Sequence, residues 1–291
     1  FGNKRIQKFD SLGNYITQWE TSENGNGKFC SPMGVWINNS LEVYVGDSGN
    51  NRIQKFDSTG NYITQWGKWS FFSGTDDIKG DIAGNVYVVD CAYSKIQKFD
   101  SSGNYITEWG TPGSGNGQFS GASSIGLDSS NNVYVSEISN NRIQKFDSAG
   151  NYLAQWGTSG SGNGQFSYPY GITVDNVGNV YVSDTGNNRI QKFDSAGNYI
   201  AQWGTSGTGD GQFSNPNGIT VDSVGNIYVV DMGNSRIQKF DSSGGFLIKW
   251  GSQGVGDGQF NFPEGISVDP LGNVYVTDTG NNRIQVFAPS P

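Results

Sequence analysis

The sequence predicts an all-β protein, a six-bladed β-propeller with four antiparallel strands in each blade. Three observations indicate this fold: a repeat of 47 residues, four strand-like runs in each repeat, and six copies of most of these runs. The tripeptide Arg-Ile-Gln, once Lys-Ile-Gln, marks the repeat. It starts at Arg5, Arg52, Lys95, Arg142, Arg189, Arg236 and Arg283, so the interval is 47 residues except for one of 43.

The repeat at residues 169–203 shows the four runs clearly. They cover 169–175, 179–184, 189–193 and 198–203 and are rich in Val, Ile, Tyr, Phe and Trp. Clusters of Gly, Asn, Asp and Ser separate them, which is typical of antiparallel strands joined by tight hairpins. Because turn residues recur about every ten residues, no stretch supports a helical period.

Counting the runs gives the number of blades. The first, second and fourth types of run occur six times each, and the third type occurs seven times. We therefore predict one domain over residues 1–291, in which each sheet packs between its neighbours around a ring. The blades are expected near 32–66, 75–109, 122–156, 169–203 and 216–250, and the last is expected to combine 263–291 with 1–19.

Strands from both termini are thus expected to close the last blade. Either 5–9 or 283–287 takes its third place, and we expect the N-terminal hairpin to enter as a pair. Residues 283–287 would then lie on an outer edge or on a neighbour, where a spare strand offers a route to self-assembly. The chain begins at Phe1, part-way through a repeat, which suggests a processed product or a piece of a longer array.

Composition limits the classes of function. The net charge is −8, and the 18 Lys and Arg are spread around the ring, so we expect no nucleic-acid binding. There is no run of 18 apolar residues, so no membrane insertion is expected. The chain has no histidine, which excludes Ser-His and Cys-His catalytic arrangements, and we expect no enzyme activity.

The repeat resembles the NHL repeat family. Residues 169–194, 216–241 and 263–287 follow its pattern of Pro-x-Gly-Ile-x-Val-Asp, Gly-Asn-Val-Tyr-Val-x-Asp and Asn-Asn-Arg-Ile-Gln-x-Phe-Asp. The resemblance implies a six-bladed propeller and, for most members, an interaction domain. A minority of relatives are enzymes, including lyases that use histidine ligands for a metal, or nucleic-acid binders.

Two repeated features are interpreted as structural. Asp184 and Arg189 flank the turn between the second and third runs, and opposite charges there stabilise a hairpin modestly. The Trp that ends each fourth run is expected to pack in the outer layer with its N–H hydrogen-bonded. The alternative for these six Trp residues is a set of equivalent sugar-stacking sites.

The residues that break the repeat are the best candidates for a site. Blade 2 is four residues shorter, lacks Pro-x-Gly, and gains aromatic and charged residues. Since first strands line the channel, its charges are expected near the mouth or wall, where calcium or a polar ligand would suit them. The alternative is solvated charge in a water-filled channel. The candidate ligand-binding residues are Trp36, Trp69, Phe71, Phe72, Asp76, Asp77, Lys79 and Asp81.

Two cysteines fall in the same sector. Cys30 precedes the first strand of blade 1, and Cys91 lies in the second hairpin turn of blade 2. These positions share one face of the ring, so a disulfide is a candidate if the Cα atoms lie within about 7 Å. Two unpaired, buried thiols are the default expectation.

Three functions remain. The leading one is a non-catalytic interaction module, extracellular or on a cell surface, that binds a protein partner through one face without a cofactor. The second is a multivalent carbohydrate binder that uses equivalent pockets between blades. The third is a calcium-dependent hydrolase or lactonase with its metal in the central channel.

Overall fold

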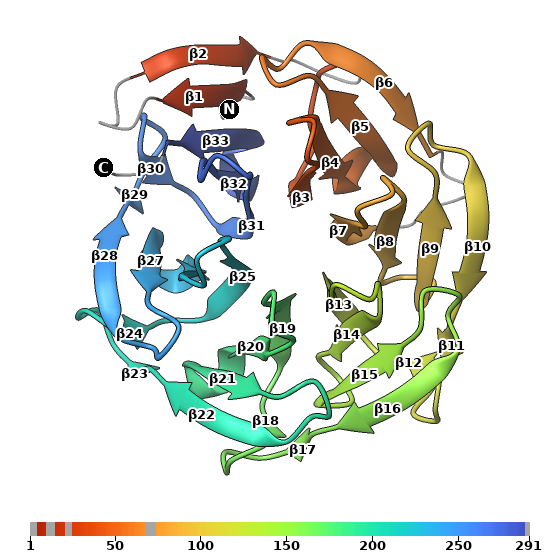
Figure 1. Cartoon of the computed structure of the whole chain (residues 1–291). Coiled ribbons are helices and arrows are strands. Elements are labelled where there is room, and N and C mark those ends of the chain that lie inside the picture. The colour runs from red at the N-terminus through yellow and green to blue at the C-terminus, as the bar shows by residue number, and fades with distance from the viewer. Residues whose placement is uncertain (1–4, 10–14, 21–24, 68–73, 289–291) are drawn as a thin grey trace.

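The computed structural model describes residues 25–67 and 74–288, and the backbone alone of residues 5–9 and 15–20. Six sheets stand in a ring, each with its first strand innermost, and the strands are antiparallel except where β1 (Arg5–Phe9) joins the last sheet (Figure 1). The prediction of an all-β, six-bladed propeller with four antiparallel strands per blade is confirmed. No helix in this described part of the chain has the length and apolarity that a membrane span requires.

Blades 1 to 3 follow one another along the chain, and the first strand of blade 1 begins at Pro32. Blade 1 contains β3 (Pro32–Ile37), β4 (Val43–Asp47), β5 (Arg52–Phe56) and β6 (Tyr62–Trp66). Blade 2 contains β7 (Thr75–Gly80), β8 (Val86–Asp90), β9 (Lys95–Phe99) and β10 (Tyr105–Trp109). Blade 3 contains β13 (Ala122–Leu127), β14 (Val133–Glu137), β15 (Arg142–Phe146) and β16 (Tyr152–Trp156).

The remaining blades follow the same order. Blade 4 contains β19 (Pro169–Val174), β20 (Val180–Asp184), β21 (Arg189–Phe193) and β22 (Tyr199–Trp203). Blade 5 contains β25 (Pro216–Val221), β26 (Ile227–Asp231), β27 (Arg236–Phe240) and β28 (Phe246–Trp250). Blade 6 contains β31 (Pro263–Val268), β32 (Val274–Asp278) and β33 (Arg283–Phe287), followed outward by β1 (Arg5–Phe9) and β2 (Tyr15–Glu20).

Short elements complete the connections. Within the described residues, four connectors between blades form two-stranded parallel ribbons. They are β11 (Thr111–Pro112) with β12 (Gln118–Phe119), β17 (Thr158–Ser159) with β18 (Gln165–Phe166), β23 (Thr205–Ser206) with β24 (Gln212–Phe213), and β29 (Ser252–Gln253) with β30 (Gln259–Phe260). Single 3₁₀ turns follow four second strands: η1 (Ser48–Asn50), η2 (Thr185–Asn187), η3 (Met232–Asn234) and η4 (Thr279–Asn281).

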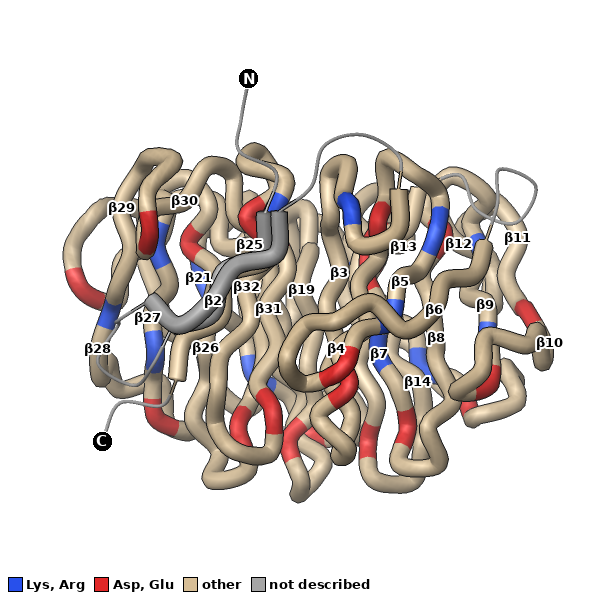
Figure 2. The backbone as a smooth tube through the Cα atoms, turned by 90° about the horizontal axis from the view of Figure 1, so that it is seen from above, with Lys and Arg blue, Asp and Glu red and all other residues tan. Residues whose placement is uncertain are grey.

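The recurrent Asp-x-x-Gly-Asn segments form the hairpins on one face of the ring. In the turn after β21, Asp194 Oδ1 accepts hydrogen bonds from the backbone N–H of Ala196 and Asn198. Gly197 has φ +88°, a conformation that favours glycine. Seen edge-on, acidic residues lie along this hairpin face, and the connectors lie on the opposite, connector face (Figure 2). The hairpin face therefore carries a row of acidic residues.

The hydrophobic core is divided into layers between neighbouring blades. In one layer Tyr134 of blade 3 packs with Ile172, Val182 and Phe193 of blade 4. The Trp that ends each fully described fourth strand covers the next blade, as where the ring of Trp156 lies against Gly197. Contrary to expectation, the indole N–H of Trp156 is buried without a hydrogen-bond partner in the described structure. The next blade thus covers part of each of these rings, and the Trp side chains are half-buried.

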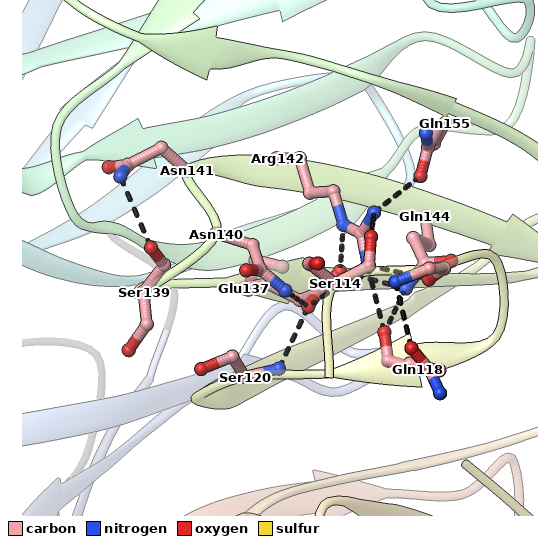
Figure 3. A network of polar contacts seen from close by, with 12 residues as sticks. Ser114, Gln118, Ser120, Glu137, Ser139, Asn140, Asn141, Arg142, Gln144 and Gln155 are labelled. Carbon is pink, nitrogen blue, oxygen red and sulfur yellow. Dashed lines mark hydrogen bonds and ion pairs between the residues drawn. The ribbon is translucent and has the colours of Figure 1, made fainter. Parts of the chain in front are cut away.

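A buried polar network ties each connector to its blade, as Figure 3 shows for blade 3. Arg142 Nε donates to Glu137 Oε1 at 2.6 Å, and its other nitrogens donate to the backbone carbonyls of Ser114, Gly115 and Gln118. Gln144 also donates to Gln118 O, at 2.8 Å. The charge pair is therefore structural, as expected, but it is buried rather than exposed, because the connector folds over it.

The ring closes between blades 6 and 1. Thr277 Oγ1 donates to Met33 O at 2.8 Å, and Val35 shares a core layer with Ile284. Strands from both termini build the last blade, but β33 takes its third place by pairing antiparallel with β32. The hairpin β1–β2 adds outside, with β1 parallel to β33. The expectation that residues 283–287 lie elsewhere was wrong, because a four-residue turn already delivers β33 to β32, a much smaller loop closure than bringing in the other terminus.

Candidate functional site

The connector-face end of each inner strand carries the residue that differs most between repeats. The ladder between first and second strands is irregular there, as between Pro169 and Ile172 in blade 4. A β-bulge of this kind re-aims side chains that a regular ladder would hold in plane. The second residues of the six inner strands are Met33, Asp76, Ser123, Tyr170, Asn217 and Glu264.

Four of these six side chains surround a small cavity in the channel, here called the neck. Its volume is about 20 Å³, which is room for one water-sized group. Blades 1, 2, 4 and 6 contribute the variable residues, and glycines of blades 4 to 6 let the backbone approach. The neck is lined by Met33, Asp76, Asp77, Lys79, Ser124, Tyr170, Gly171, Gly218, Ile219, Glu264, Gly265 and Ile266.

Two carboxyl groups of the neck lack a cationic partner among the described residues. Burial raises the pKa of Asp76 to about 7, and the charge of Glu264 acts in the same direction. Burial also raises the pKa of Glu264, whose described hydrogen bond comes from Tyr170 Oη at 3.4 Å. Burial, followed by the charge of Glu264, raises the pKa of Tyr170 well above its usual range. The neck is therefore an acidic site whose charges are poorly compensated.

Asp77 has a different environment. Its Oδ2 accepts hydrogen bonds from Ser124 Oγ at 2.5 Å and from the backbone N–H of Ile125 at 3.1 Å. Ser124 Oγ in turn accepts from Ile172 N at 3.3 Å. Asp77 therefore links blades 2, 3 and 4 through these hydrogen bonds. It is the third residue of its inner strand, a position that is glycine or serine in the other blades.

A second, wider cavity lies toward the hairpin face and is here called the bowl. Its volume is about 370 Å³, and the fifth residues of the inner strands line it. They lie three residues from those of the neck, about 10 Å along a strand. The bowl is lined by Trp36, Ile37, Asn39, Lys79, Gly80, Gly126, Leu127, Thr173, Val174, Asn176, Thr220, Val221, Asp222, Ser223, Ser267, Val268, Asp269 and Pro270.

The residues chosen from the sequence thus separate into groups. Asp76 and Asp77 meet at the neck, Trp36 lines the bowl, and Lys79 reaches both cavities. Asp81 lines neither, because its carboxylate accepts hydrogen bonds from Asn85 and Tyr87 within its own hairpin. The other three candidates, Trp69, Phe71 and Phe72, lie outside the described residues.

The two cysteines are free thiols rather than a disulfide. Cys30 packs against Gly49 in the turn of its own blade. Cys91 is hydrogen-bonded to Asp76, and burial followed by the Asp76 charge raises the pKa of its thiol to about 12. Each thiol is held within its own blade, in agreement with the expectation of two unpaired thiols.

Residues 25–67 and 74–288 contain no cluster of three or more carboxylates, thiols or imidazoles placed to hold a metal ion. Asp77 is directed toward Ser124 rather than toward a shared centre with Asp76 and Glu264. The expected calcium ligands are therefore not assembled in this part of the chain.

A known protein family matches the repeat in four of the six blades. The NHL repeat family matches residues 29–56, 166–193, 213–240 and 260–287. Each matched segment covers the first three strands of one blade in a six-bladed ring. The chain is an NHL-repeat propeller. No curated protein matches it.

Three solved structures similar to this NHL-repeat propeller are distant from it in sequence. A catalytically inactive virginiamycin B lyase from Staphylococcus aureus has a TM-score of 0.66 at 19% identity, over 93% of this chain and 83% of the lyase. A protein of unknown function from Bacteroides thetaiotaomicron has a TM-score of 0.75 at 20% identity, over 98% and 75%. An auxiliary nutrient binding protein from Bacteroides ovatus has a TM-score of 0.66 at 14% identity, over 90% and 70%. These similarities show the fold alone.

Sequence reasoning missed two residues of this NHL-repeat propeller's neck, Tyr170 and Glu264. Both stand in blades that otherwise follow the repeat closely, whereas blade 2 departs from it. The signal was the x of Pro-x-Gly, which is Met33, Tyr170, Asn217 and Glu264 in successive Pro-x-Gly blades. A position that varies while its neighbours repeat is free of the scaffold's constraint.

We expect Asp76→Asn to stabilise the fold at high pH. The folded-state pKa of Asp76 is about 7, above the ordinary 3.8, so its contribution to stability is full below pH 4 and is lost as the pH rises through 7. Asparagine removes this loss. The variant should equal the parent at pH 4 and exceed it by about 2 kcal/mol at pH 8 in urea unfolding, a discounted conversion of the shift.

Asp210→Asn is the control for that measurement. Asp210 forms an exposed ion pair with Lys249, so its replacement should change stability by less than about 1 kcal/mol. If the free energy of unfolding of Asp76→Asn differed from that of the parent by the same amount at pH 4 and at pH 8, the raised pKa of Asp76 would be contradicted.

Proposed function

We propose that this NHL-repeat propeller is a non-catalytic binding module that accepts a lysine side chain of a protein partner at its neck. The observation that carries the proposal is the pair Asp76 and Glu264, whose pKa values are raised around a cavity of about 20 Å³. An ammonium group is water-sized and would supply the missing positive charge. Three of the residues that line the neck are acidic, and the one lysine among them, Lys79, forms no ion pair with a described carboxylate.

The connector face supports a macromolecular partner rather than a free amine. Tyr168 and Phe262 stand on this face just before the inner strands of blades 4 and 6 and are 64% and 63% exposed. Aromatic residues beside a charged pocket are typical of protein interfaces. A partner could therefore contact aromatic side chains while one lysine enters the neck.

The absence of histidine favours binding over catalysis. The similar virginiamycin B lyase is catalytically inactive when one of its histidines is replaced by alanine, and this chain contains no histidine. The neck offers carboxyl groups and a phenol, and the nearby Cys91 thiol, hydrogen-bonded to Asp76, has a raised pKa, so none of these groups is an activated nucleophile.

The test is titration of the protein with Nα-acetyl-L-lysine amide, followed by NMR at millimolar concentrations. We expect binding that is at least about tenfold weaker in Glu264→Gln and that weakens as the pH falls below 7, because Asp76 gains a proton. Nα-acetyl-L-norleucine amide, which lacks the ammonium, should not bind. Equal binding of the two amides, or an unchanged affinity in Glu264→Gln, would contradict the proposal.

A further inference from the structure

We infer that the bowl is a second, separate binding site, for a monosaccharide unit that carries a carboxylate, that is, a uronic acid. It lies toward the hairpin face, away from the proposed lysine site. Its volume of about 370 Å³ falls within the range of small-molecule pockets, whereas the neck has room for a single water-sized group.

Three hydroxyl groups line the bowl on blades 4, 5 and 6. Thr173, Thr220 and Ser267 occupy the same place in blades 4, 5 and 6 and are only 6%, 6% and 5% exposed. None of these hydroxyls has a hydrogen-bond partner among the described residues, yet none is sealed from the cavity. Buried hydroxyls that keep both donor and acceptor capacity are suited to the hydroxyl groups of a sugar.

Another part of the wall supplies a rigid apolar surface. Trp36 occupies the corresponding place in blade 1, and its indole lies on the backbone of Gly80, where a Cβ atom would come within 2.2 Å of the ring. Its ring also packs against Tyr44, with centroids 4.8 Å apart. The indole is therefore held in place before a ligand arrives, which suits the C–H groups of a pyranose ring.

The ammonium of Lys79 selects an acidic sugar. Lys79 occupies the same position in blade 2 as Trp36 does in the adjacent blade 1. It has no ion pair with any carboxylate in the described structure. An uncompensated cation on the wall of a cavity is a partner for a ligand carboxylate. The other lysines of the repeat differ: Lys98, for example, lies over the ring of Tyr87 at 4.8 Å.

Two carboxylates at the rim do not cancel this preference. Asp222 has Lys239 Nζ at 4.0 Å and accepts hydrogen bonds from Asn226. Asp269 accepts from the backbone of Asn273 and from Tyr275 Oη within its own hairpin. Both are occupied by their turns, and their charge favours a ligand with one negative charge over a polyanion.

The test is calorimetric or NMR titration of the intact protein with sodium D-galacturonate, D-galactose and sodium acetate. Galacturonate should bind at least about tenfold more tightly than galactose, and acetate should not compete at equal concentration. Lys79→Met should reduce galacturonate affinity to the level of galactose. Thr220→Val, which has a similar shape, should weaken both sugars several-fold.

Lys98→Met is the matched control, because it removes the same charge from the same blade outside the bowl. It should bind galacturonate like the parent. Galacturonate binding that survives Lys79→Met, equal affinity for galactose in the parent, effective competition by acetate, or no sugar binding at all would each overturn the inference. Circular dichroism of every variant separates loss of binding from loss of fold.

Discussion

Arg189→Met should destabilise the propeller by about 3–5 kcal/mol, the cost of breaking a buried ion pair by removing one partner. Arg189 Nε donates to Asp184 Oδ2 at 2.7 Å, and Asp184 is fully buried. The remaining guanidinium nitrogens donate to the carbonyls of Ser161, Gly162 and Gln165. Methionine keeps much of the packing but leaves a buried carboxylate and three connector carbonyls without this donor. The measurement is the free energy of unfolding in urea.

The repeat itself supplies the control. Lys95 occupies the same position in blade 2 and pairs with Glu108, with both side chains 35% exposed. Lys95→Met should therefore cost less than about 1 kcal/mol, as exposed ion pairs do. If Arg189→Met cost no more than Lys95→Met, the buried network would not be what holds the connectors to the blades.

The fold was predictable because one repeat contains nearly all the information that a blade needs. Val180, Val182 and Ile190 are buried between neighbouring blades, and the same residue types recur at a fixed period. Ring closure was less predictable. The runs at 5–9 and 283–287 are almost identical in sequence, so only chain connectivity distinguishes them.

The candidate site was predicted in part. The irregular sequence of blade 2 predicted Asp76, Asp77 and Lys79 as site residues, and all three line the neck. The separation of neck from bowl was not foreseen. It depends on the bulge at the start of each inner strand and on Lys79 lying three residues beyond Asp76, and neither bulge position nor side-chain direction is encoded in composition.

Gly218→Ala should cost at least about 2–3 kcal/mol, because it overpacks the contact between two inner strands. A Cβ atom at Gly218 would lie 2.2 Å from the carbonyl oxygen of Glu264. That oxygen belongs to the backbone of β31, so relief requires the two strands to separate rather than one side chain to rotate. The measurement is again urea unfolding, together with lysine-amide binding, since the same shift moves Glu264.

Gly126→Ala is the matched control on another inner strand. Its Cβ atom would meet a methyl group of Val174 at 3.2 Å, a contact that a small side-chain movement relieves. We expect a change below about 1 kcal/mol and normal lysine-amide binding. Because the ring is closed, a blade forced outward at Gly218 has no free edge toward which to relax. Equal stabilities for the two variants would therefore mean that the inner strands are less tightly apposed than the close approach at Gly218 implies.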